Sequence, residues 1–309
     1  MACAAVAGAG SMGLLLAAKL NASGIACELW TRTEEQAEAL VRDGISLQDE
    51  TGEELSRVAV RAMPLEEAAT ARSDGPKVVF LAVKQTALKP PLLALLARAV
   101  PTDGTIVALQ NGFGHLEALK EALPETEVVP AVTTEGALRK SGTTVSHTGK
   151  GEFRVGLADE SDRRSSDRVE AMLKQAGFTA FVSNEWEEAL LRKLLANAVI
   201  NPLTAIWGAR NGQLLESERK KAVMKALFRE TYGILRGRKE IGEEDELWRS
   251  VMRVCEKTAA NRSSMLQDVL AGRETEIDYI NGAVCRMAEE QGLPSPWNET
   301  LTALVKAIP

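Results

Sequence analysis

The chain has 309 residues, of which 45% are hydrophobic and 26% are charged, so it is long enough to form two hydrophobic cores. Its 43 Asp and Glu residues outnumber 37 Lys and Arg residues, and no basic block or basic–aromatic stretch suggests a nucleic-acid surface. The cysteines, Cys3, Cys27, Cys255 and Cys285, lie far apart, which argues against a disulfide framework or a zinc motif and fits a reducing compartment.

The first segment, MACAAVAGAGSMGLLLAAKL, is apolar, but it has no basic residues at its start and glycines at fixed spacing interrupt it. We therefore interpret it as a strand, a turn and a helix rather than as a signal peptide. No other stretch approaches the ~18 uninterrupted apolar residues that a membrane span needs. We expect a soluble cytoplasmic protein with no nucleic acid, membrane or metal partner.

Short apolar strands alternate with helical patterns through the first half of the chain. We expect strands at residues 4–7, 26–31, 78–83 and 105–109, with helices at residues 13–20 and 34–41. This alternation is typical of βαβ units and predicts a mostly parallel sheet. Thr33 and Gln36 have the spacing of a capping box, in which both side chains satisfy free N–H groups at the start of the second helix.

The residue composition and the periodicity of the sequence change twice further along the chain. Residues 128–155 are rich in Val, Thr and Gly, so we expect antiparallel or mixed edge strands that extend the sheet, followed by a helix at 162–175 and a strand at 178–182. After Ser183 only helical periodicity remains, through residues 185–205, 218–238, 244–258, 263–270, 277–291 and 297–307. The sequence therefore predicts two domains, an α/β domain at 1–183 and a helical domain at 184–309.

A glycine-rich turn directly follows the first strand and opens the first helix, with the sequence Gly8-Ala9-Gly10-Ser11-Met12-Gly13. The first glycine of such a GxGxxG turn permits the tight bend, the second lets the backbone approach a pyrophosphate, and the third allows close helix–strand packing. The free N–H groups at the helix start would bind the anion. We predict a dinucleotide site in a Rossmann-type, doubly wound sheet; an ordinary strand–helix turn is the alternative.

The residue after the second strand is Arg32, where NAD-specific folds usually carry an acidic residue about 20 residues past the glycines. An arginine fork can pair with phosphate oxygens, whereas a carboxylate would bind a free 2′-hydroxyl and repel a 2′-phosphate. We therefore predict NADP rather than NAD as the cofactor. The alternative is a solvated arginine beside Glu34 and Glu35.

Two further strands end in polar residues, Lys84-Gln85 and Gln110-Asn111-Gly112. Ligands of open α/β sheets lie beyond the carboxyl ends of the strands, so these residues fall where a nicotinamide or its riboses would lie. Each alone could be an ordinary polar loop. Together they favour a site.

In the helical half, Lys193, Asn197 and Asn201 recur at i, i+4 and i+8 and share one stripe of a helix that is otherwise Leu, Ala, Val and Ile. Burying each amide without a partner would cost about 1 to 3 kcal/mol, which favours the wall of a cleft over a plain surface. Burial would lower the pKa of Lys193 toward neutrality and suit it to protonate a carbonyl oxygen as hydride arrives. The alternative is a half-exposed stripe that binds neighbouring loops.

The other candidates for acid–base work are weaker. A histidine is the commoner proton donor in dehydrogenases, but His115 follows a turn and His147 lies in the Thr- and Val-rich region, so we expect neither to be catalytic. Two helix starts near the C-terminus could present Ser264 and Glu276 to one cleft, although Ser263 and Thr275 are ordinary N-cap candidates.

Several stretches together identify a family resemblance: GAGSMG, LWTR, AVKQ, LQNGFGH, TEGA, RKLLANAVINPLTA, NGQLL and NRSSMLQDVLAGRETEIDYING. In order and spacing, over nearly the whole chain, they resemble the ketopantoate reductase family. The last four make the match specific, because a GxGxxG turn alone occurs in many families.

The resemblance implies a Rossmann-type domain followed by an all-helical domain of the 6-phosphogluconate dehydrogenase-like type. It implies NADPH-dependent reduction of 2-dehydropantoate (ketopantoate) to (R)-pantoate in pantothenate (vitamin B5) synthesis, with Lys193 as proton donor and Glu276 completing the catalytic site. The cofactor would be bound by Gly8, Ala9, Gly10, Ser11, Met12, Gly13, Arg32, Lys84, Asn111, Ala137 and Glu276. The 2-oxo acid would be bound by Asn111, Lys193, Asn197, Asn201, Asn211, Asn261 and Ser264.

Other activities stay open at this point. A reductase of a different 2-oxo or 3-hydroxy acid, or an opine-type dehydrogenase that joins an oxo acid to an amine, would share the same carboxylate-binding residues. A catalytically silent NADPH sensor would share the cofactor motif. Trp186, Trp207, Trp248 and Trp297 could line an intramolecular core or a dimer surface, and of the two we expect a homodimer.

Overall fold

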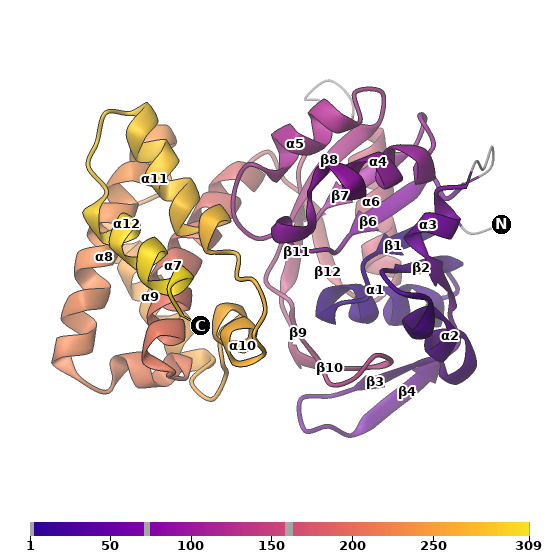
Figure 1. The fold of residues 1–309 in the computed structure, drawn as a ribbon, viewed down its shortest axis with the longest axis horizontal. Coiled ribbons are helices and arrows are strands. Elements are labelled where there is room, and N and C mark those ends of the chain that lie inside the picture. The colour runs from indigo at the N-terminus through magenta and orange to yellow at the C-terminus, as the bar shows by residue number, and fades with distance from the viewer. Residues whose placement is uncertain (1–2, 71–74, 158–162, 309) are drawn as a thin grey trace. The chain divides into compact units, whose positions relative to one another are not determined.

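The structure, a computed structural model, describes residues 3–70, 75–157 and 163–308. The chain forms two compact units, one of residues 1–110 and 115–186 and the other of residues 111–114 and 187–309. The short segment 111–114 was expected in the sheet domain, but its contacts assign it to the second unit. Each unit is described by itself below (Figure 1).

The first unit is built on an eight-stranded sheet. Its strands follow the order β12-β11-β8-β7-β6-β1-β2-β5. The six consecutive strands from β8 to β5 run parallel, as predicted. Chain order reverses between β1 and β6, which makes the carboxyl ends of these two strands the expected ligand crevice. The strands are β1 Ala4–Ala7, β2 Cys27–Thr31, β5 Arg61–Pro64, β6 Val78–Leu81, β7 Thr105–Ala108, β8 Glu127–Thr133, β11 Glu152–Val155 and β12 Thr179–Val182.

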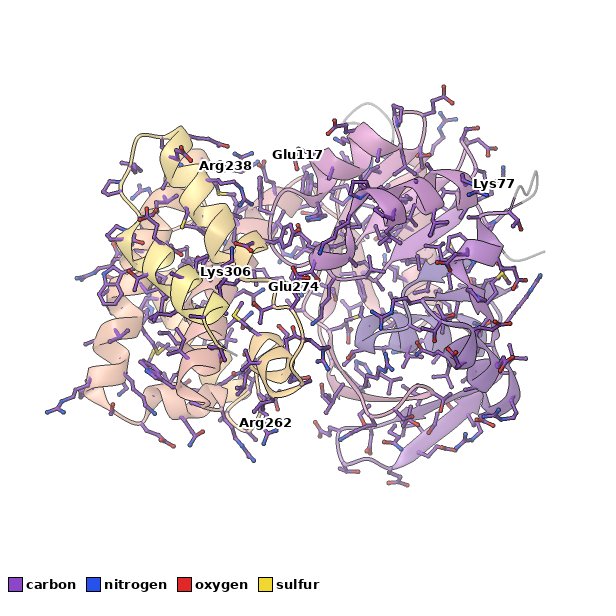
Figure 2. All side chains as sticks on the ribbon, viewed as in Figure 1. Lys77, Glu117, Arg238, Arg262, Glu274 and Lys306 are labelled. Carbon is purple, nitrogen blue, oxygen red and sulfur yellow. The ribbon has the colours of Figure 1, made fainter. Side chains whose placement is uncertain are left out.

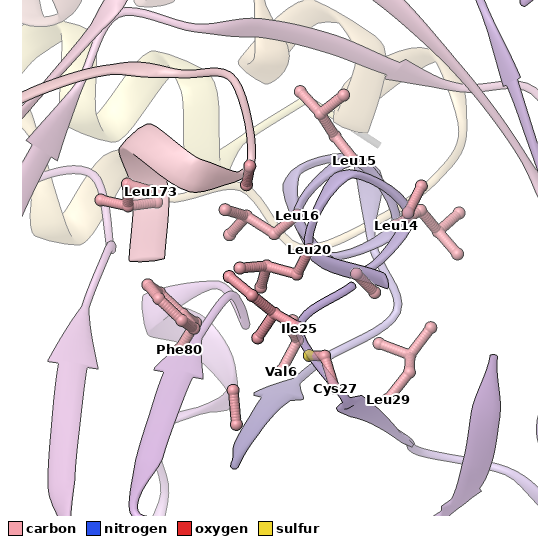
Figure 3. Close-up of a cluster of buried hydrophobic side chains, with 14 of the residues drawn as sticks. Val6, Leu14, Leu15, Leu16, Leu20, Ile25, Cys27, Leu29, Phe80 and Leu173 are labelled. Carbon is pink, nitrogen blue, oxygen red and sulfur yellow. The ribbon is translucent and has the colours of Figure 1, made fainter. Parts of the chain in front are cut away.

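Helices cover both faces of this sheet. Alternation along β1 shows how, because Ala4 and Val6 belong to one buried cluster while Ala5 and Ala7 belong to another. On the first face lie α1 Ser11–Ala22, α2 Glu34–Asp43 and α6 Arg164–Gln175, and on the second lie α3 Leu65–Ala68, α4 Pro90–Ala99 and α5 His115–Ala122. Figure 3 shows the leucines of α1 packed over β1, β2 and β6. Asp162, the predicted first residue of α6, lies outside the described residues.

A second, four-stranded sheet corrects part of the prediction. Its order is β4-β3-β10-β9, with β3 Ile45–Gln48, β4 Glu54–Val58, β9 Gly136–Arg139 and β10 Thr144–Gly149 (Figure 1). The region 128–155 was expected to extend the main sheet, but only β8 and β11 do so, and β9 and β10 leave it. β9 pairs with β10, and β10 pairs with β3, about one hundred residues earlier, a non-local contact that local patterning does not encode.

The predicted capping box at α2 is half right. Thr33 Oγ1 accepts a hydrogen bond from Gln36 N at 3.4 Å, as expected of the N-cap residue. The Gln36 side chain does not turn back to Thr33. Its Nε2 donates to Ala9 O at 3.2 Å and to Gly142 O at 3.0 Å, so the amide joins α2 to the glycine-rich turn and to the β9–β10 hairpin.

The second unit is helical throughout its described residues, as predicted. Its elements are α7 Trp186–Trp207, η2 Asn211–Leu215, α8 Glu218–Arg238, α9 Glu244–Lys257, α10 Ser264–Leu270, η3 Ile277–Tyr279, α11 Asn281–Glu290 and α12 Pro296–Lys306. The predicted helix at 277–291 is divided at Ile280, whose backbone is not helical. Figure 1 shows α8, α9, α11 and α12 gathered around α7.

α7 is the core helix of this unit. Leu191, Leu194, Leu195, Ala198 and Val199 are at most 1% exposed and belong to one buried cluster. By length and composition α7 is also apolar enough to cross a membrane, but most of it is buried by the surrounding helices. Its apolar character is therefore explained by core packing.

Two contacts attach the segment 111–114 to the second unit. Phe113 N donates to Tyr279 O at 3.0 Å, and the Arg238 guanidinium of α8 lies 4.5 Å from the centre of the Phe113 ring. Figure 2 labels Arg238. Gly112 and Gly114 flank the phenylalanine with φ of +90° and +96°, a backbone region that favours glycine.

Candidate active site

The three glycines of the turn after β1 have the local geometry that the motif predicts. Gly8 has a φ of +107°, and a Cβ there would lie 2.8 Å from Val83 Cγ1. A Cβ on Gly13 would lie only 1.8 Å from Gly8 O, so α1 packs directly on the turn. A Cβ on Gly10 would meet only Ala82 O, at 4.0 Å, which leaves open space where a ligand can approach the protein main chain.

The start of α1 offers hydrogen-bond donors to that open space. Gly10 is the N-cap residue without a side-chain cap, and the first helical bond runs from Leu14 N to Gly10 O at 2.9 Å. The N–H groups of Ser11, Met12 and Gly13 therefore have no acceptor within the helix. No acidic residue lies in the first turn, so the positive end of the helix dipole is available to an anion.

The glycine-rich turn is held from outside by two side chains that sequence patterns did not reveal. Ala9 O accepts from Gln36 Nε2 and, at 3.3 Å, from Arg139 Nη1 of β9. Arg139 N also donates to Ser11 Oγ at 3.1 Å. The Ser11 side chain thus binds the hairpin, and Ala137, on the same strand, packs against the core cluster beside α1.

Gly13→Ala should disrupt this turn. A methyl group 1.8 Å from a carbonyl oxygen forces the helix away from the strand, so we expect a loss of about 1 to 3 kcal/mol of stability together with weakened dinucleotide binding. Urea unfolding measures the first effect, and fluorescence titration with a nicotinamide dinucleotide measures the second. Gly233→Ala is the matched control, because Gly233 lies on α8 with no atom near its Cβ position and alanine should be tolerated or stabilising there. Equal behaviour of the two variants would contradict the assigned packing role.

Arg32 follows β2 and is exposed. The preceding Thr31 is buried, and its Oγ1 donates to Thr33 O at 2.8 Å, which fixes the backbone on either side. Within the part of the chain that the structure describes, no ion pair joins Arg32 to Glu34 or Glu35. Arg32 is thus exposed and unpaired with its acidic neighbours, which fits a solvated side chain as well as a phosphate ligand, and its predicted role in cofactor binding stays a prediction.

Four polar residues follow β6 and β7. Two of them have structural contacts, and the other two are candidates for ligand binding. Gln110 is 5% exposed, and its Nε2 donates to Leu81 O at 2.8 Å and Val83 O at 3.1 Å, which ties the two strand ends together. Gln85 is 1% exposed and contacts His115 Nδ1 at 3.2 Å. Lys84 is half-buried in the first unit, and Asn111 is half-buried in the second. The roles predicted for Lys84 and Asn111 stay predictions.

Both histidines have partners within the first unit. His115 is buried against Gln85, and His147 Nε2 lies 2.5 Å from Glu135 Oε2 in a largely buried pair. A ring nitrogen of each is thereby engaged by a neighbouring side chain, and the expectation that neither is catalytic stays a prediction. No group of three or more His, Cys, Asp or Glu residues suited to a metal occurs among the described residues.

The polar stripe on α7 has the environment that acid–base chemistry needs. Burial lowers the pKa of Lys193 to about 8, and the Glu276 carboxylate opposes that shift. Asn201 is 6% exposed and Asn197 is half-buried, and neither amide has a hydrogen-bond partner among the described residues. Two unpartnered amides beside a lysine are available to bind a carboxylate.

Residues after α9 complete the surroundings of this stripe. Glu276 is 5% exposed and caps η3 through its backbone carbonyl, while Thr275 caps no helix. Ser263 caps α10, because its Oγ accepts from Leu266 N at 3.1 Å, and the same Oγ lies 2.7 Å from Thr204 Oγ1 of α7. Ser264, the predicted substrate ligand, is exposed at the start of α10.

Asn211 and Asn261 have structural contacts with each other. Asn211 N donates to Asn261 O at 3.0 Å, and Asn211 Nδ2 donates to Thr258 Oγ1 at 2.8 Å. The Asn211 Oδ1 atom is buried without a partner among the described residues, and the Asn261 side chain is exposed. The pair joins η2 to the end of α9, and its predicted role in substrate binding stays a prediction.

Comparisons with known proteins agree with this architecture. A family model described as "Ketopantoate reductase PanE/ApbA" matches residues 4–160, and the model of the family's C-terminal part matches residues 185–309. The 2-dehydropantoate 2-reductase of Bacillus subtilis strain 168 is 34% identical over 305 residues, which cover 98% of this chain and 96% of that protein.

Solved structures show the same fold. The crystal structure of the probable 2-dehydropantoate 2-reductase from Bacillus subtilis is 34% identical, has a TM-score of 0.80 and aligns over 99% of both chains. D-mandelate dehydrogenase with NADH and anilino(oxo)acetate has a TM-score of 0.90 over 98% of this chain and 97% of its own, but at 23% identity it shows likeness of fold alone. Family models match both halves of the chain, and a relative named 2-dehydropantoate 2-reductase aligns with nearly all of it. The chain therefore belongs to the ketopantoate reductase family.

Proposed function

We propose that this protein reduces 2-dehydropantoate to (R)-pantoate with NADPH, a step of pantothenate synthesis. The observation that carries the proposal is the α7 stripe, in which a lysine with a pKa lowered to about 8 is followed by two amides without partners. The choice of substrate rests on relatives named 2-dehydropantoate 2-reductase, which align over 98% of the chain.

The first unit has features that fit a dinucleotide. Gly10 leaves open space above the turn, three N–H groups at the start of α1 would bind the pyrophosphate, and the exposed Arg32 guanidinium would bind the 2′-phosphate. When bound, NADPH would supply the hydride that adds to the C2 carbonyl of the oxo acid. Lys84, Asn111 and Ala137 are proposed to lie along it on the strength of the family resemblance.

In the second unit, Lys193 would act as the general acid. Its ammonium form donates a proton to the C2 oxygen as negative charge develops there, and the amine that remains recovers a proton from solvent. Asn197 and Asn201 would donate their N–H groups to the substrate carboxylate, with Ser264 as a further donor. The Glu276 carboxylate keeps Lys193 protonated over a wider pH range than burial alone would allow.

The pH dependence of turnover follows from this assignment. A pKa near 8 means that Lys193 carries its proton below that pH and loses it above, so the rate of reduction should fall tenfold for each pH unit well above about 8. A profile of kcat against pH, measured at saturating NADPH and substrate, tests this. The same profile for Lys193→Arg should lack the limb near pH 8, since arginine stays protonated. A wild-type rate that is constant through this range would contradict the assignment.

The rival activities differ in the substrate beyond the carboxylate. NADPH oxidation should be followed with 2-dehydropantoate, with other 2-oxo acids of similar size, and with those acids together with amino acids. We expect the highest kcat/KM with 2-dehydropantoate and no gain from an amine. A higher value with another 2-oxo acid or an amine-dependent rate would replace the proposed substrate, and no oxidation with any acid would favour an NADPH sensor.

A further inference from the structure

A proline inside α7 leaves one carbonyl of the core helix without its usual donor. Pro202 has no N–H, so the oxygen of Ala198, four residues earlier, cannot form the helical hydrogen bond. Ala198 is fully buried, which keeps water from replacing that donor. The fold therefore has to satisfy this oxygen from another element.

Asn281, the first residue of α11, provides the donor. Its Nδ2 lies 2.9 Å from Ala198 O and 2.9 Å from Asn298 Oδ1, and the side chain is fully buried. The two contacted residues are on α7 and α12. One amide thus connects three helices at the point where the hydrogen bonding of α7 is interrupted.

A chain of polar groups holds Asn281 in place. The next member, Asn298, is also fully buried and donates through Nδ2 to Glu230 Oε1 at 2.9 Å and to Thr231 Oγ1 at 3.1 Å. The other carboxylate oxygen of Glu230 accepts from Trp297 N at 3.0 Å at the start of α12. The orientation of Asn281 is therefore fixed by α8 and α12 together.

The interruption falls within the polar stripe. Asn197 directly precedes Ala198 and Asn201 directly precedes Pro202, so one amide lies just before the altered turn and the other lies within it. Asn201 is also held by its backbone, whose oxygen accepts from Thr204 Oγ1 at 2.9 Å. The direction of the Asn201 amide relative to Asn197 and Lys193 consequently depends on the geometry of α7 at this turn.

We propose that Asn281 is a positioning residue for the side-chain amides of Asn197 and Asn201, which would bind the substrate. By binding the Ala198 carbonyl that Pro202 leaves without a helical donor, it fixes the geometry of α7 at this turn and aligns Asn201 with Asn197 and Lys193. The inference rests on the proposed function, since that function supplies the 2-oxo acid that these side chains would bind.

The first test removes the proline, a change that should not impair folding. Pro202→Ala restores an N–H to α7 that can form the helical hydrogen bond to Ala198 O, so the melting temperature should stay equal or rise. We expect KM for the 2-oxo acid to rise about tenfold because a small misplacement of binding groups is costly, while the Kd for NADPH stays unchanged. Unchanged KM and kcat would overturn the positioning role.

The second test measures whether Asn281 and Pro202 act on the same carbonyl. Asn281→Leu removes the donor at similar size, and it should lower the melting temperature much less in the Pro202→Ala background than with Pro202 present. With Pro202 present, the folded variant should also show a raised KM for the 2-oxo acid. An equal loss of stability in both backgrounds, or failure to fold in both, would overturn the shared-carbonyl assignment.

A matched control separates positioning from stability. Gln291 Nε2 donates to Ile234 O at 3.0 Å and Met287 O at 2.9 Å, away from α7, so Gln291→Leu also removes an amide that serves two carbonyls. It should lower the melting temperature without changing KM. The melting experiments need no substrate, so if the wild-type protein reduces no 2-oxo acid, the proposed function fails while the shared carbonyl is still tested.

Discussion

Lys193→Ala should lower kcat roughly 100- to 10,000-fold, the usual contribution of a positioned general acid. The reason is the local environment, because burial brings the pKa of Lys193 to about 8 and makes its ammonium a good proton donor near neutral pH. The Kd for NADPH should stay within about twofold, since Lys193 is not among the residues assigned to the dinucleotide and the glycine-rich turn and Arg32 lie in the other unit. Steady-state rates and NADPH fluorescence titration check both parts.

Lys221→Ala is the matched control for this variant. Lys221 is on α8 of the same unit, where it forms an exposed ion pair with Glu218, so its loss should leave kcat unchanged. A near-normal rate for Lys193→Ala would remove Lys193 from the mechanism. An equal loss of rate in both lysine variants would indicate a general effect on the unit rather than a lost proton donor.

Arg32→Asp should reverse the preference between the two nicotinamide cofactors. A guanidinium that binds a 2′-phosphate contributes on the order of 1.5 to 3 kcal/mol, so NADPH binding should weaken by at least about tenfold, and the new carboxylate adds repulsion. NADH binding should be unchanged or improved, because a carboxylate can accept from the free 2′-hydroxyl. Kd values for both cofactors give the ratio directly.

The control for that change is Arg42→Asp. Arg42 lies on α2 in the same unit and is exposed, and its ion pair with Asp43 is away from the glycine-rich turn. Its replacement changes the net charge equally but should leave the NADPH-to-NADH ratio intact. If Arg32→Asp also leaves the ratio intact, another residue selects the cofactor.

Local patterns predicted those parts of the fold that local physics determines. Spacing within one segment predicted the Gly8–Gly13 turn and the limits of α8. The alternation of strands and helices predicted the parallel strands around β1. The small sheet was not predicted, because β10 was expected to extend the main sheet, whereas it pairs across the chain with β3, whose short, mixed sequence resembles a loop. Gln36 was misassigned for the same reason, since its partner Gly142 is 106 residues away.

In the candidate site, too, local spacing predicted some features, while contacts between distant residues were missed. The i, i+4, i+8 spacing placed Lys193, Asn197 and Asn201 on one face of α7, and their apolar neighbours suggested burial. Periodicity could not reveal that Asn281, 83 residues from Ala198, supplies a donor to that helix. Pro202 was a visible signal, because a proline inside a helix always leaves a carbonyl for another group to satisfy.

The most direct test is the identity of the product formed from 2-dehydropantoate and NADPH by the purified wild-type protein. Chiral chromatography of the reaction, together with NADPH consumption, gives both the product and the stoichiometry. We expect (R)-pantoate as the product, with as many molecules formed as NADPH molecules oxidised. No NADPH oxidation, or a product other than pantoate, would contradict the account.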